Sequence, residues 1–86
     1  MYQKIDSNEI IHESVARKLY PDNYILMEKE ESKPGEQATL GKVLYVGDTY
    51  RELLHLQVNL PVLNGVVIEG IEVARKNSYG GVLLVV

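Results

Sequence analysis

One continuous run, from Thr39 to Glu52, constrains the fold more than any other part of the chain. It begins with an apolar stretch over Leu40–Val46, whose branched and aromatic residues favour a β-strand. Gly47 and Asp48 then interrupt the apolar pattern. Thr49 followed three positions later by Glu52 has the spacing of a capping box at a helix N-terminus. The run therefore predicts a strand, a tight turn and a helix that begins near Thr49.

The segment before this run predicts a helix over Asp6–Tyr20 that ends at Pro21. Asp6 is followed three positions later by Glu9, which is again the spacing of a helix cap. Apolar residues recur at helical spacing and form the stripe that we expect to face the core: Ile11, Val15 and Leu19.

A second helix is predicted over Tyr50–Val58, with four apolar residues on the face expected to pack on the core: Tyr50, Leu53, Leu54 and Val58. Strands are predicted over four segments: Tyr24–Glu28, Leu40–Val46, Val66–Val73 and Val82–Val86. Gly70 marks a bulge or bend inside the third of these strands. The polar stretch Glu30–Gln37 contains Pro-Gly and predicts a mobile loop between the first two strands.

The predicted element order is α-β-β-α-β-β, an α+β fold with a four-stranded, mostly antiparallel sheet and both helices on one face. The last strand is wholly apolar, which favours a place inside the sheet and the strand order 1-2-4-3. That arrangement is a circularly permuted ferredoxin-like fold. The alternative is the order 1-2-3-4, in which the second and third strands pair in parallel.

The length of 86 residues is sufficient for one domain, spanning residues 1–86. The chain has no cysteine, which excludes disulfides, thiolate nucleophiles and cysteine metal sites. A net charge of −3 argues against nucleic acid as a partner, because nucleic-acid binding needs a concentrated basic surface. We see neither a signal peptide nor an apolar run of about 20 residues, so we expect a cytoplasmic protein with no membrane contact.

The residue types that carry chemistry show no catalytic or metal-binding spacing. His12 and His55 are the only histidines, and we interpret both as surface residues. The acidic residues are interpreted as solubilising charge: Glu28, Glu30, Glu31, Glu69 and Glu72. We therefore predict no catalytic residue, no metal and no cofactor, and the motifs favour a protein that is not an enzyme. Six tyrosines without Phe or Trp suit half-buried surfaces or an interface.

Two resemblances rest on short motifs. The segments Tyr20–Leu26 and Gly41–Thr49, with the following helix that contains Glu52, resemble small bacterial α+β proteins of no assigned function. That resemblance covers about half of the chain and implies no activity. The run Gly41–Gly47 also resembles the Gly-Xaa-Val-Xaa-Xaa-Val-Gly strand of the small co-chaperonin. Because that family is all-β and this chain predicts two helices, we reject the second resemblance.

Self-association is the functional expectation that the sequence supports best. Two helices cover only one face of a four-stranded sheet, so the other face should expose either Val43 and Tyr45 or Leu44 and Val46. Alternate residues of the last strand would join them, and we take these six as the interface: Val43, Leu44, Tyr45, Val46, Leu83 and Val85. We expect a homodimeric interaction or structural module. Two alternatives stay open: edge-to-edge pairing of the C-terminal strand, and a small enzyme or ligand-binding subunit with its site at the subunit interface.

Overall fold

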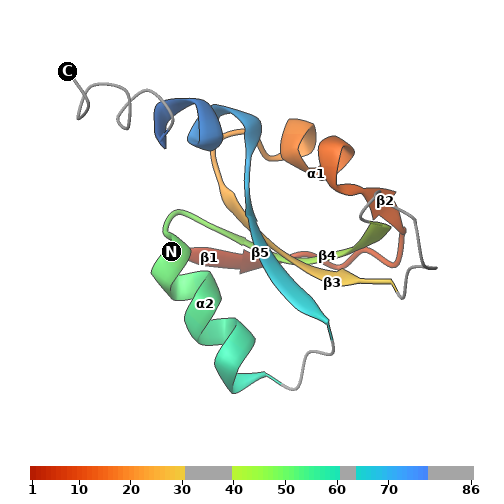
Figure 1. Cartoon of the computed structure of the whole chain (residues 1–86). Helices are drawn as coiled ribbons and strands as arrows, with labels where there is room; N and C mark the ends of the chain where they lie inside the picture. Colours follow the sequence, from red (N-terminus) through yellow and green to blue (C-terminus); the bar gives the residue numbers. More distant parts are fainter. Residues whose placement is uncertain (31–39, 61–63, 78–86) are drawn as a thin grey trace.

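The computed structural model describes residues 1–30, 40–60 and 64–77, and these form a small α+β fold (Figure 1). The labelled elements follow one another as β1 (Tyr2–Lys4), β2 (Ile11–His12), α1 (Glu13–Leu19), β3 (Tyr24–Lys29), β4 (Leu40–Gly47), α2 (Tyr50–Asn59) and β5 (Gly65–Glu69). A further helical segment covers residues 71–77. The predicted α+β class is confirmed, and every pairing among the described strands is antiparallel.

The sheet has the strand order β1-β4-β3-β5, and β2 also pairs with β4. β4 therefore lies inside the sheet, with β3 on one side and the N-terminal strands β1 and β2 on the other. This confirms the predicted interior position of Leu40–Val46. Both predicted strand orders are wrong, because within the described residues β5 pairs with β3, and the neighbours of β4 are β3 and the two N-terminal strands. The described order consequently does not match the permuted ferredoxin-like arrangement. The predicted strand Val82–Val86 lies outside the described residues.

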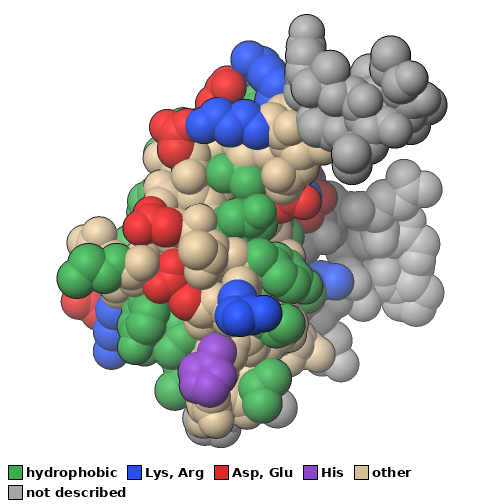
Figure 2. All heavy atoms as spheres, turned by 90° about the vertical axis from the view of Figure 1, so that its left-hand side faces the viewer, with side chains coloured by type: hydrophobic (Ala, Val, Ile, Leu, Met, Phe, Trp, Pro, Cys, Tyr) green, Lys and Arg blue, Asp and Glu red, His purple; other side chains and the backbone are tan. Residues whose placement is uncertain are grey.

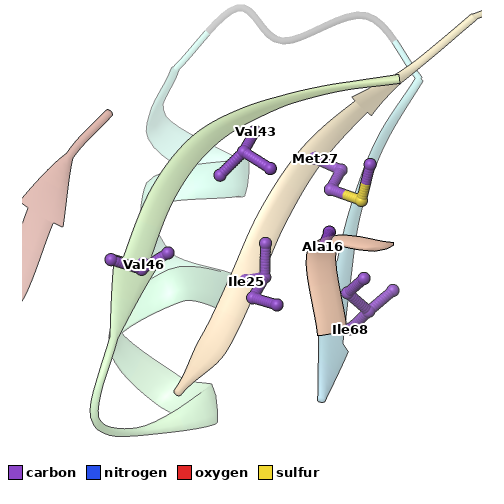
Figure 3. Close-up of a cluster of buried hydrophobic side chains, with 6 residues drawn as sticks. All are labelled: Ala16, Ile25, Met27, Val43, Val46 and Ile68. Carbon is purple, nitrogen blue, oxygen red and sulfur yellow. The ribbon is translucent and has the colours of Figure 1, made fainter. Parts of the chain in front are cut away.

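The two labelled helices lie over opposite faces of the sheet (Figure 1). Ala16 of α1 belongs to the core cluster on one face, together with the side chains shown in Figure 3: Ile25, Met27, Val43, Val46 and Ile68. Side chains alternate along a strand, so Tyr24 and Leu26 point to the other face. The Tyr24 ring contacts the Tyr50 ring of α2 there, with centroids 5.9 Å apart. The prediction that both helices cover one face is therefore wrong.

A β-bulge in β4 decides which of its side chains reach the core. Leu26 pairs with Tyr45 and Met27 pairs with Val43, so Leu44 is an extra residue on β4. The extra residue shifts the alternation, and Val43 and Val46 both join the cluster on the α1 face, 2% and 6% exposed. The predicted pairing of Val43 with Tyr45 and of Leu44 with Val46 on common faces is wrong for this reason.

The first predicted helix is also shorter than expected, because α1 begins only at Glu13. Part of the preceding segment pairs with β4 instead, where backbone groups of that strand would otherwise lack partners. Asp6 and Glu9 do not cap a helix; His12 does, since its Nδ1 accepts a hydrogen bond from the Ser14 backbone N–H at 3.1 Å.

Beyond β5 the predicted strand gives way to a helix. The strand stops at Glu69, and residues 71–77 are helical where Ile71–Val73 was predicted to be extended. Gly70 marks the change of direction, so its predicted role as a bend is confirmed, although at the end of the strand and not inside it. Most of the predicted loop Glu30–Gln37 lies outside the described residues.

Candidate interaction surface on helix α2

Helix α2 begins at a complete capping box. The Thr49 hydroxyl accepts a hydrogen bond from the Glu52 backbone N–H at 3.3 Å. The Glu52 carboxylate in turn accepts from the backbone N–H groups of Thr49 and Asp48, both at 3.0 Å. These bonds satisfy backbone groups that a helix start leaves without partners. The predicted capping box and second helix are confirmed. The cap fixes where α2 begins, and the burial of Leu53 defines the rotation of the helix on the sheet.

That rotation buries less of α2 than its sequence predicts. Leu53 is fully buried, and Leu56 and Gln57 are half-buried. Three apolar residues four positions apart remain on the outer side: Tyr50, Leu54 and Val58, which are 48%, 39% and 77% exposed. The Tyr50 ring still contacts the Tyr24 ring of β3, but the side of α2 that is buried on the sheet is the one around Leu53. The predicted place of these three residues in the core is therefore wrong. We name Tyr50, Leu54 and Val58 the α2 stripe.

Two shallow hollows border the α2 stripe. The first, of about 320 Å³, is lined by Tyr2, Thr49, Arg51, Glu52, His55 and Leu56. The second is lined by Arg51, Leu54, His55 and Val58, so Arg51 and His55 belong to both. Figure 2 shows hydrophobic side chains gathered around a histidine and a basic side chain on this side of the molecule. The surface is thus a mostly apolar strip that carries a cation and an imidazole.

The charges at the start of α2 are already paired. The amino group of Met1 lies 2.9 Å from one Glu52 carboxylate oxygen and 3.3 Å from Asp48. The hydrogen bond from this amino group lowers the pKa of Glu52, and the backbone N–H of Thr49 lowers it further. The hydrogen bond to Glu52 in turn raises the pKa of the amino group. Arg51, by contrast, has no ion-pair partner within the described part of the chain.

Four of the six residues predicted to form an interface are described, and they do not share one exposed face. Val43 and Val46 are buried in the core of the single chain, which removes them from any surface patch. Leu44 and Tyr45 are half-buried, and the Tyr45 ring contacts the Tyr2 ring edge to face at 5.8 Å. Leu83 and Val85 lie outside the described residues. An interface that includes Leu44 and Tyr45 stays a prediction.

The two histidines lie on different elements and have different surroundings. His12 caps α1, and its Nδ1 lies 2.8 Å from the Ser14 hydroxyl. His55 lies on the outer side of α2 between the two hollows. Within residues 1–30, 40–60 and 64–77, no group of three or more His, Asp or Glu side chains is placed to hold a metal ion. No helix of the same ranges is long and apolar enough to span a bilayer.

No protein-family model, no curated protein and no solved structure matches this chain. The assignment of the α2 stripe as a candidate interaction surface is therefore based on the structure alone. A sequence signal for it exists in hindsight: α2 has apolar residues at positions 50, 53, 54, 56 and 58, more than one buried face of a ten-residue helix accommodates.

Proposed function

We propose that this protein is a small cytoplasmic interaction module that acts as a homodimer, and that the α2 stripe forms the dimer interface. The observation that carries the proposal is the exposure of Tyr50, Leu54 and Val58 along one line of a capped, well-fixed helix. Apolar residues that share one exposed line form a contiguous patch, and such patches mark interaction surfaces. The helices on both faces of the sheet argue against the sheet-face interface that the sequence suggested.

A second copy of the chain fits the α2 stripe by symmetry. Residues four positions apart lie on one line of a helix, and a twofold axis that passes by Leu54 places two such helices antiparallel. Each Leu54 then meets its counterpart, and each Tyr50 meets the Val58 of the other copy. In this arrangement the α2 stripe of one copy is complementary to the same stripe of the other copy. A partner of unrelated sequence would need its own apolar surface of matching shape.

The test is the oligomeric state of two matched double variants. Leu54→Glu/Val58→Glu places two carboxylates on the α2 stripe. Val15→Glu/Leu19→Glu makes the same substitution, at the same spacing, on α1, where these side chains are 43% and 59% exposed. We expect sedimentation velocity at micromolar concentration to give a dimer for the wild type and the α1 variant, and a folded monomer for the α2 variant. A wild-type monomer, or an α2 variant that stays dimeric, contradicts the proposal.

A second candidate is a ligand-binding or enzymatic subunit whose site lies beside the same interface. The hollow next to the α2 stripe favours it, because Tyr2, Glu52 and His55 line a single space there. A titration with small aromatic carboxylates, followed by the NMR signals of the His55 ring, tests it. Saturable shifts that are lost in Tyr2→Ala support a ligand site. Shifts that stay linear with concentration leave the interaction module as the function.

A further inference from the structure

Strand β5 forms one edge of the described sheet. Within the described residues β5 pairs only with β3. At one end of β5 the Asn64 carbonyl accepts from the Lys29 backbone N–H at 3.0 Å, and at the other end the Gly70 N–H donates to Asn23 at 2.8 Å. Because backbone groups alternate sides along a strand, even-numbered residues face β3. Gly65, Val67 and Glu69 therefore point their N–H and C=O groups away from the sheet.

Two side chains from opposite layers of the molecule reach this edge. Arg17 of α1 donates from Nη1 to the Glu69 carbonyl at 3.1 Å. Gln57 of α2 donates from Nε2 to the Gly65 carbonyl. The two carbonyls are four residues apart, about 13 Å along the strand. Val67 is thus the one outward residue of β5 whose carbonyl has no side-chain donor in the described structure.

We propose that Arg17 and Gln57 close the edge of β5 against the addition of β5 from a second copy of the chain. A twofold antiparallel pairing centred on Val67 would use three outward carbonyls in each copy, and two of them already accept these side-chain hydrogen bonds. An added strand must displace both donors from their carbonyls, so that Gln57 loses its hydrogen bond to Gly65 and Arg17 keeps only its ion pair with Glu13 at 3.9 Å. Displacing a hydrogen-bonded charged group costs more than the bond that replaces it returns.

The chemistry of β5 explains why such closure matters. Its sequence is Gly-Val-Val-Ile-Glu, with a single charge at one end, and short β-branched strands of low charge pair readily at an open edge. Natural sheets protect edges with charged side chains or with covering elements, and here α1 and α2 each supply one donor. The inference is independent of the α2 stripe, because it concerns a surface that the folded chain keeps closed.

The test compares two double variants in the Leu54→Glu/Val58→Glu background, which removes the α2 stripe. Arg17→Met/Gln57→Leu deletes both donors. Lys18→Met/Asn59→Leu removes the same charge and the same amide function from the same helices and leaves β5 closed. We expect sedimentation equilibrium to show self-association at least about tenfold tighter for the first variant than for the control. Equal association in the two variants overturns the inference.

Proline at Val67 distinguishes strand addition from unspecific aggregation. Val67 points its N–H outward, so Val67→Pro keeps the hydrogen bonds to β3 and removes a donor that the added strand needs. We expect this change to abolish the gained association; association that persists overturns the inference. Amide hydrogen exchange of the wild-type protein measures the protection of the β5 backbone without any substitution. The Val67 amide should exchange faster than those of Val66 and Ile68, because its N–H points outward and has no strand partner within the described residues. Equal protection of all three amides would overturn the inference, because it would mean that another segment already pairs with this edge.

Discussion

Replacing Gly70 by alanine should destabilise the fold strongly, and more than the same change at Gly47. The reason is that Gly70 lies against backbone atoms where the end of β5 meets the turn after α1. A Cβ at Gly70 would lie 2.1 Å from the Tyr20 carbonyl oxygen and 2.5 Å from that of Pro21. Both are backbone atoms, so neither can rotate away. The turn after α1 and the end of β5 must therefore move apart by about an ångström, which overpacked sites tolerate poorly.

The hydrogen bonds that this movement breaks set the magnitude. The Gly70 N–H donates to Asn23 at 2.8 Å, and the Pro21 carbonyl accepts from the N–H groups of Glu72 and Val73 at 2.9 and 3.1 Å. At about 1 kcal/mol each, the loss of these bonds lowers the free energy of unfolding by about 3 kcal/mol. For a domain of this size, that corresponds to a melting temperature lower by more than about 10 °C.

Gly47→Ala is the matched control. A Cβ there meets only side-chain atoms, those of Leu53 and Tyr2 at 3.2 Å and that of Glu52 at 3.3 Å. Leu53 and Glu52 can shift by a small side-chain rotation, and the Tyr2 Cβ can shift with the short edge strand β1, so we expect a change within about 1 kcal/mol. The assay is thermal unfolding followed by circular dichroism. If Gly70→Ala melts within about 2 °C of the wild type, the close packing of β5 on the turn after α1 is refuted.

Three further predictions concern α2. Thr49→Ala should lower the free energy of unfolding by about 1 kcal/mol in urea titrations, because the Glu52 N–H loses its acceptor; an unchanged midpoint contradicts the cap. Glu52→Gln should destabilise at neutral pH. The folded-state pKa of Glu52 is lowered, so its contribution is fully present above the unfolded pKa of about 4.3 and is lost as the pH falls through the lowered folded value. The two melting temperatures should therefore approach each other as the pH falls below about 4.3; a constant gap would argue against this. Leu53→Ala should cost about 2–5 kcal/mol and Leu54→Ala less than about 1 kcal/mol when measured on dilute protein. Equal costs would mean that α2 is rotated differently.

Local signals predicted the parts of the fold that local chemistry determines. The run of branched and aromatic residues gave the strand β4, and the Thr49–Glu52 spacing gave the start of α2, because propensity and capping depend on neighbours in the sequence. The same reasoning predicts a helix over Asp6–Tyr20, yet residues 11–12 pair with β4 and α1 begins only at Glu13. A weak cap at Asp6 cannot compete with hydrogen bonds to a strand whose edge is otherwise open. Competition between a helix and strand pairing can be judged only when the position of the partner strand in the sheet is known.

The position of the exposed apolar surface could not be predicted from the sequence, because periodicity does not identify the extra residue Leu44 in β4. Strict alternation along β4 places Val43 and Val46 on opposite faces, so both faces are expected to be apolar. The sequence then predicts a dimer through one sheet face, because two helices on the same side cover only the other. The bulge at Leu44 moves both valines onto one face, where α1 covers them. The Leu26 face is then left for α2, which covers it with Leu53 and has its remaining apolar residues facing outward. The exposed apolar surface therefore lies on α2 and not on the sheet, and this is where we propose that a second copy binds.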